Sequence, residues 1–167
     1  MPAPAKIHGS FIASFTSINI EQPAGCFLEG YLSMLPKSLV VFENQKILLL
    51  DDNRDLLQIV QIILKGQGYE SVLACCIDEA VTKIHIHKPS LILMDVYISD
   101  EDGREFCSRL KNDKETNTIR VIMMSGYDNN LGMMAWVGAD DFMQKPFDYN
   151  DLVTRVNRQM IQAKAWA

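Results

Sequence analysis

The sequence predicts an α/β domain in which a five-stranded parallel sheet is covered by helices on both faces. From Lys46 onward, short continuous apolar runs alternate with segments whose apolar residues recur at helical spacing. Such runs are typical of strands buried on both faces of a parallel sheet. Five strands that alternate with five helices favour that architecture over an antiparallel one.

Each predicted strand precedes a predicted helix. The strands are expected at residues 46–50, 69–75, 91–94, 119–124 and 141–144. The first helix carries apolar residues from Leu56 to Leu64 and ends at the glycines 66 and 68. The others are expected at residues 78–87, around Phe106 and Leu110, at 128–137 and at 151–164.

Composition limits the classes of protein to consider. The chain has 167 residues, of which 48% are hydrophobic, and 16 Lys and Arg against 21 Asp and Glu give a formal charge of -5. This acidic balance argues against direct binding to nucleic acid or to an anionic membrane. No run reaches the roughly 18 apolar residues of a membrane span. Cys26, Cys75, Cys76 and Cys107 form no C-x-x-C pair and no zinc motif, which favours a reduced, cytoplasmic protein.

The first 44 residues differ from the rest of the chain. They contain scattered prolines and glycines and no recognisable motif. Apolar residues between Phe11 and Ile20 fit a strand or an amphipathic turn equally well. We therefore expect an N-terminal extension at 1–44 and one domain at 45–167.

Five polar residues share one predicted location. Asp51, Asp52, Asp95, Ser125 and Lys145 fall at or just after the carboxyl ends of predicted strands. In an open α/β sheet these ends form the ligand crevice at the point where strand order reverses. Taken singly, each has a simpler explanation, such as a helix N-cap for the Asp-Asp pair or a solvated turn for the Lys. If the simpler explanations held, three acids, one hydroxyl and one Lys would lie in a single crevice by accident.

The chemistry of these residues is coherent. Three neighbouring carboxylates repel one another, and a hard divalent cation such as Mg²⁺ removes that repulsion. A carboxylate can act as a nucleophile and form an acyl phosphate. An ammonium group and a hydroxyl would then contact the phosphoryl oxygens that the metal leaves uncovered, and positioning of this kind is what phosphoryl transfer requires.

The chain from about Lys46 to Ala165 resembles the receiver domain of two-component response regulators. The matching segments are Lys46–Asn53 (KILLLDDN), Leu91–Asp95 (LILMD), Asp102-Gly103, Val121–Gly126 (VIMMSG) and Phe142–Phe147 (FMQKPF). Each segment alone is weak, but their order and spacing together are specific. The resemblance implies a flavodoxin-like doubly wound sheet of strand order 2-1-3-4-5.

The resemblance also implies roles for individual residues. Asp95 would accept the phosphoryl group, and Lys145 and Ser125 would contact it. Mg²⁺ would be bound by Asp95, by Asp52 directly, by Asp51 largely through water and by the backbone carbonyl of Tyr97. Ser125 and the aromatic side chain of Phe142 would form the switch, with Phe142 turning inward when Ser125 moves.

The function that follows is a phosphorylation-activated signalling switch. A sensor histidine kinase or a phosphotransfer protein would donate the phosphoryl group, and no enzymatic activity is expected beyond self-catalysed phosphoryl acceptance and autodephosphorylation. The chain ends soon after the last predicted helix, so we expect no output domain and a message passed by contact with a downstream protein. A homodimer is also compatible.

One alternative is a pseudo-receiver that acts as a binding or dimerisation module. Another is a phosphatase with an Asp nucleophile, although hydrolases of that type place the nucleophile after the first strand.

Three departures from the usual receiver pattern stand out. Ser99 occupies a position where the family usually has Pro, which predicts a less rigid loop after Asp95. Tyr97 and Tyr127 each lie two residues after a site residue, and we expect their rings to slow loss of the phosphoryl group. The segment from Leu131 to Trp136 is unusually apolar, which fits either a helix packed on the sheet or a docking surface.

Overall fold

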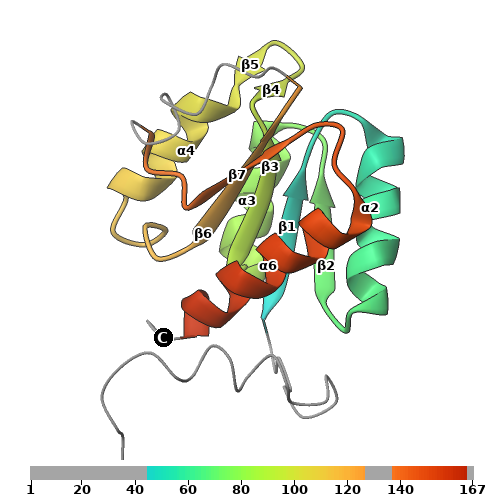
Figure 1. The fold of residues 1–167 in the computed structure, drawn as a ribbon. Coiled ribbons are helices and arrows are strands. Elements are labelled where there is room, and N and C mark those ends of the chain that lie inside the picture. Colours follow the sequence, from blue (N-terminus) through green and yellow to red (C-terminus); the bar gives the residue numbers. More distant parts are fainter. Residues whose placement is uncertain (1–44, 127–136, 165–167) are drawn as a thin grey trace, which may run out of the picture. The chain divides into compact units, whose positions relative to one another are not determined.

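The computed structural model describes residues 45–126 and 137–164 (Figure 1). Several expectations concern residues outside these ranges. They are the strand or turn between Phe11 and Ile20, nearly all of the helix at 128–137, and the nature of the extension at 1–44. The boundary between residues 44 and 45 therefore stays a prediction.

The main sheet has five parallel strands. They are β1 (Lys46–Leu50), β2 (Glu70–Ala74), β3 (Leu91–Asp95), β6 (Arg120–Ser125) and β7 (Asp141–Gln144). Their order across the sheet is β2-β1-β3-β6-β7, and all four pairings are parallel. Numbered within this sheet, the order is 2-1-3-4-5, which confirms the predicted flavodoxin-like topology. Strand order reverses between β1 and β3, so a crevice is expected beyond their carboxyl ends.

Helices cover both faces of the sheet (Figure 1). On one face, α2 (Arg54–Gly66) and α6 (Tyr149–Lys164) bury residues such as Leu57 and Leu152 against the inward side chains of the strands. On the other face, α3 (Ile77–His87) and α4 (Gly103–Asn112) bury residues such as Ile84 and Phe106. Alternate residues of β1 and β3 point into the two cores, which explains why both strands are apolar throughout. None of the helices in the described ranges has the length and hydrophobicity needed to cross a membrane.

Local sequence sets where the first helix begins and ends. Asn53, not the Asp-Asp pair, is the N-cap of α2, and its side chain accepts a hydrogen bond from the backbone N–H of Leu56. The two aspartates are thereby left free of a capping role. The helix ends at Gly66, and Gly68 follows with a φ of 87°, a left-handed conformation that glycine adopts without strain.

A short antiparallel hairpin was not predicted from the sequence. It consists of β4 (Tyr97–Ile98) and β5 (Glu101–Asp102), joined by Ser99 and Asp100. It lies in the loop after Asp95, where a Ser in place of Pro predicted lower rigidity. Strands of two residues carry too little periodicity to be recognised in a sequence.

Candidate functional site

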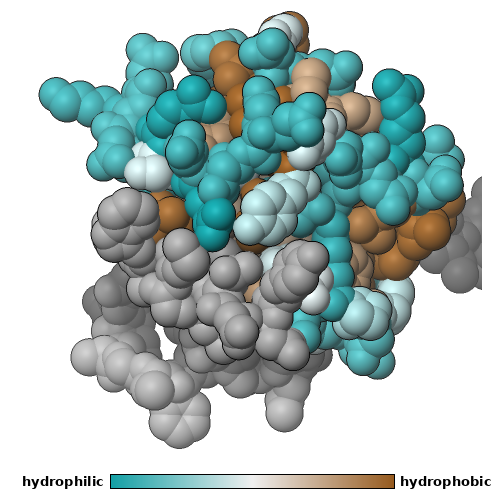
Figure 2. All heavy atoms as spheres, turned by 90° about the horizontal axis from the view of Figure 1, so that it is seen from above, coloured by the Kyte–Doolittle hydropathy of each residue, from teal (hydrophilic) through white to brown (hydrophobic). Residues whose placement is uncertain are grey.

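Three carboxylates lie together at the carboxyl edge of the sheet. Asp51 and Asp52 follow β1 directly, and Asp95 is the last residue of the neighbouring strand β3. One carboxylate oxygen from each lies within 4.8 Å of the others. Figure 2 looks down on this end of the domain and shows mainly hydrophilic side chains, with smaller hydrophobic areas. The predicted clustering of the three acids is therefore present.

Lys145 connects two of these carboxylates. It follows β7, and its backbone N–H donates a hydrogen bond of 2.7 Å to the carbonyl of Ser125 at the end of β6. Its Nζ donates to Asp51 Oδ2 at 2.7 Å and to Asp95 Oδ2 at 2.8 Å. Residues from three separate strands thus meet around one ammonium group, as the strand-end pattern predicted.

Negative charge exceeds positive charge within this cluster. Burial raises the pKa of Asp51, although hydrogen bonds from Lys145 and Asn53 act in the opposite direction. Burial lowers the pKa of Lys145, but its hydrogen bonds to Asp51 and Asp95 outweigh this effect, and the net change is upward. Lys145 is therefore a permanent cation at neutral pH. One cation facing three acids leaves an excess of negative charge that a divalent ion would neutralise.

Asp95 is held at the point where the chain turns from β3 towards α4. Its Oδ1 accepts a hydrogen bond from the N–H of Val96 at 2.7 Å, while Lys145 occupies Oδ2. Gly103 packs against this turn, and its N–H donates to the Val96 carbonyl at 2.8 Å. A Cβ atom at position 103 would lie below 3.0 Å from the Asp95 carbonyl oxygen. The Asp102-Gly103 motif thus has a steric reason, since only glycine allows this approach.

The two residues predicted to form the switch lie on neighbouring strands. Ser125 ends β6 with 1% of its surface exposed, and it pairs with Gln144 of β7. Phe142 of β7 pairs with Met123 and is half-buried against the core that α3 and α4 form with the sheet. Both residues therefore lie within the strand pair that leads to Lys145.

The backbone carbonyl of Tyr97, a predicted metal ligand, is not used in the pairing of β4 with β5. Antiparallel strands alternate between hydrogen-bonded and non-hydrogen-bonded residue pairs. Gly103 donates to Val96, so the next pair along the hairpin, Tyr97 with Asp102, is of the non-hydrogen-bonded kind. The carbonyl of Tyr97 consequently points away from the partner strand β5.

Arg104 is a neighbour of the site that sequence reasoning missed. Its guanidinium carbon lies 5.5 Å from the centroid of the Tyr97 ring, a cation–π arrangement. The same guanidinium is paired with Asp102, with Nη2 2.6 Å from Oδ2, and Asp102 also caps α4. This pairing lowers the pKa of Asp102 and raises that of Arg104. The arrangement depends on the hairpin, which the sequence did not reveal.

Tyr127 and the apolar segment from residue 131 to 136 lie outside the described residues.

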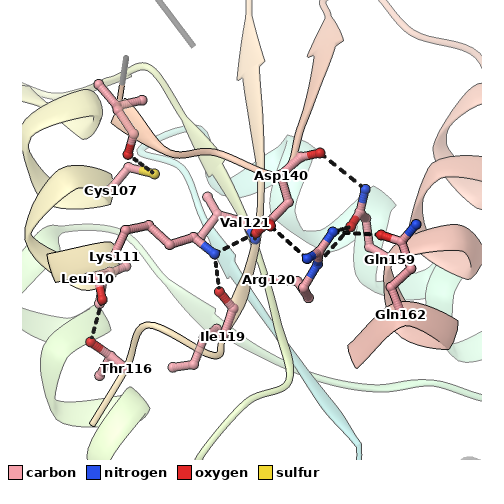
Figure 3. Close-up of polar contacts among 11 residues, drawn as sticks. Cys107, Leu110, Lys111, Thr116, Ile119, Arg120, Val121, Asp140, Gln159 and Gln162 are labelled. Carbon is pink, nitrogen blue, oxygen red and sulfur yellow. Dashed lines mark hydrogen bonds and ion pairs between the residues drawn. The ribbon is translucent and has the colours of Figure 1, made fainter. Parts of the chain in front are cut away.

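A polar network at the end of the sheet opposite the carboxylate cluster holds the start of β7, the strand that Lys145 follows. Asp140 precedes β7, and its carboxylate accepts hydrogen bonds from Lys111 Nζ at 2.6 Å and from the N–H of Val121 at 2.7 Å (Figure 3). It also pairs with Arg120 at 2.8 Å. Arg120 in turn donates to the Oε1 atoms of Gln159 and Gln162 on α6. This polar network joins α4, β6, α6 and the start of β7.

Comparison with known proteins gives the class of this fold and site. Residues 47–157 match the family of response regulator receiver domains. The alkaline phosphatase synthesis transcriptional regulatory protein PhoP of Bacillus subtilis is 35% identical over 115 residues, which are 68% of this chain and 47% of PhoP. The chain therefore belongs to the response regulator receiver family. It spans about half the length of this relative.

Solved structures agree with this assignment. A receiver domain protein of the CheY-like type from Methanospirillum hungatei superposes with a TM-score of 0.67 at 26% identity and covers 74% of this chain and 98% of its own. A putative response regulator from Chloroflexus aurantiacus gives 0.65 at 28% identity, covering 70% and 98%. Receiver domains are phosphorylation-based switches of two-component signalling, bind Mg²⁺ at an acidic pocket, and interact with histidine kinases or phosphotransfer proteins.

Proposed function

We propose that this protein accepts a phosphoryl group on Asp95, with Mg²⁺ bound beside it, and signals through contact with a downstream protein. The observation that carries the proposal is the cluster of Asp51, Asp52 and Asp95, with Lys145 paired to the first and last of them, at the point where strand order reverses. Hard carboxylate oxygens in excess over cationic groups suit Mg²⁺. The Tyr97 carbonyl would complete this oxygen ligand set.

Each residue of the cluster would have a separate part in the transfer. Asp95 Oδ2 would be the attacking oxygen, because its partner Lys145 can move from the carboxylate to the incoming phosphoryl oxygens while Oδ1 stays on the Val96 N–H. Asp51 would keep Lys145 aligned as it moves. Bound Mg²⁺ would supply neutralisation of phosphoryl charge. Ser125 would donate its hydroxyl to a phosphoryl oxygen.

The response to phosphorylation would pass along β6 and β7. Ser125 and Phe142 lie on these paired strands, and Lys145 follows β7 directly. A shift of Ser125 toward the phosphoryl group would make room for the half-buried Phe142 to turn inward. The altered surface would be read by a protein partner. The phosphoryl donor would be a sensor histidine kinase or a phosphotransfer protein in the cytoplasm, where Cys75, Cys76 and Cys107 would stay free thiols.

The metal requirement offers a direct test. Phosphorylation by acetyl phosphate would be followed on phosphate-affinity gels while the Mg²⁺ concentration is varied. We expect Asp52→Asn to need much more Mg²⁺ for the same rate, because one ligand charge is lost. Asp55→Asn is the matched control, since Asp55 lies in the first turn of α2 outside the cluster. Equal Mg²⁺ dependence in wild type and Asp52→Asn would contradict the proposed metal site.

A further inference from the structure

The carboxylate of Asp52 is held by the backbone of the hairpin after Asp95. The N–H of Ser99 donates a hydrogen bond of 2.9 Å to Asp52 Oδ2 across 47 positions of sequence. Within the described ranges this is the one hydrogen bond that the Asp52 side chain accepts. Asp51 and Asp95, by contrast, are each held by Lys145 as well as by a backbone N–H. The orientation of Asp52 therefore depends on Ser99 more than its two neighbours depend on any single donor.

Ser99 adopts an unusual conformation to make this bond. Its φ is 54°, in the left-handed region that serine rarely occupies. Lys88 is the other residue besides glycine with a positive φ in the described chain, and it caps the end of α3, a common place for that conformation. Ser99 has no helix end to explain it. A strained residue of this kind persists where its surroundings enforce it, and such residues gather at functional sites.

The turn itself would favour glycine at this position. Ser99 and Asp100 are the two central residues of the hairpin, and only the first has a positive φ. That pattern is typical of a type II′ turn, whose first central residue is usually Gly. Proline, which the family pattern places here, has no N–H and a φ near −65°. It could neither form this turn nor donate to Asp52.

We propose that Ser99 is a positioning residue, which orients Asp52 for Mg²⁺ through its main-chain N–H. This role rests on the proposed magnesium site. An exposed carboxylate otherwise samples several rotamers. The bond from the hairpin restricts Asp52 while one of its oxygens lies within 4.8 Å of oxygens of Asp51 and Asp95. Where the family usually has a rigid proline loop, the hairpin of this chain holds the proposed metal ligand Asp52 directly through a hydrogen bond.

Calorimetric titration with MgCl₂ tests this role without any measurement of phosphorylation. Wild type and Ser99→Gly should bind with the same affinity, because glycine keeps the N–H and adopts the positive φ readily. Ser99→Pro should bind about tenfold more weakly, as expected for a lost hydrogen bond to a charged group. In an Asp52→Ala background the same Pro substitution should cause no further loss, since the group it acts through is absent.

The outcomes separate the two proposals. If wild type binds Mg²⁺ and Ser99→Pro binds equally well, the positioning role is wrong and the magnesium site stands. If wild type binds no Mg²⁺, the proposed function is wrong, and the positioning role of Ser99 is wrong as well.

A second measurement does not depend on Ser99→Pro folding. Amide hydrogen exchange of Ser99 in metal-free protein, observed by NMR, should be slow in wild type and faster in Asp52→Ala. Exchange at the same rate in both proteins would overturn the hydrogen bond on which the role depends.

Discussion

Replacing Gly103 by Ala should destabilise the domain severely, because the obstacle is backbone. The new Cβ would lie under 3.0 Å from the Asp95 carbonyl oxygen and 3.2 Å from that of Val96. No side-chain rotation can relieve either contact, so the start of α4 or the end of β3 must move. Such a movement also weakens the 2.8 Å hydrogen bond from Gly103 to the Val96 carbonyl.

The magnitude follows from these two effects. Overpacking against fixed atoms costs about 2 kcal/mol, and the weakened hydrogen bond adds about 1 kcal/mol. A loss of about 3 kcal/mol in the free energy of unfolding should lower the Tm by about 10 °C in a domain of this size.

Thermal unfolding followed by circular dichroism would measure this loss, with Gly66→Ala as the control. Gly66 is the last residue of α2, and a Cβ there would meet nothing within 4 Å. The control should be neutral or more stable by about 0.5 kcal/mol, because alanine suits a helix better than glycine. A Gly103→Ala protein that unfolds within about 2 °C of wild type would refute the steric reasoning.

Three further predictions concern other parts of the domain. Burial raises the pKa of the Cys107 thiol to about 11, so this thiol stays protonated at pH 8. Iodoacetamide should therefore label Cys75 and Cys76 much faster than Cys107 in the folded protein. Equal labelling of the three cysteines by mass spectrometry would contradict this. Asp140→Asn should reduce the free energy of unfolding by about 2 kcal/mol, since two cations lose their shared carboxylate at a partly buried site, and an unchanged urea midpoint would argue against a stabilising network. Tyr97→Asn should shorten the lifetime of the acyl phosphate severalfold if the ring that stacks on Arg104 hinders the hydrolytic water, whereas decay no faster than in wild type would exclude that role.

The sheet and its site were predictable because periodicity reports burial. Strands buried on both faces must be apolar throughout, so a polar residue at the end of such a run marks the carboxyl edge of the sheet. This reasoning brought Asp51, Asp95 and Lys145 together although they are far apart in the chain, and the ion pairs of 2.7 and 2.8 Å agree with it. The simpler explanation of the Asp-Asp pair, as the N-cap of α2, does not hold, because Asn53 takes that position.

The hairpin after Asp95 could not be predicted from the sequence. Its strands have two residues each, and the turn is formed by Ser99 and Asp100, where sequence rules call for glycine. Its geometry depends on a contact with Asp52, 47 positions away, which no local pattern encodes. The stacking of Arg104 on Tyr97 was missed for the same reason, because it exists only once the hairpin has formed.

The most direct test of the central claim is intact-mass spectrometry after incubation with acetyl phosphate. Wild type and Asp95→Asn would be compared with and without Mg²⁺. We predict a single phosphoryl adduct in wild type that requires Mg²⁺ and is absent from Asp95→Asn. Well-folded wild-type protein that gains no adduct, or an adduct that survives the loss of Asp95, would contradict the account and favour a module that binds partners without phosphorylation.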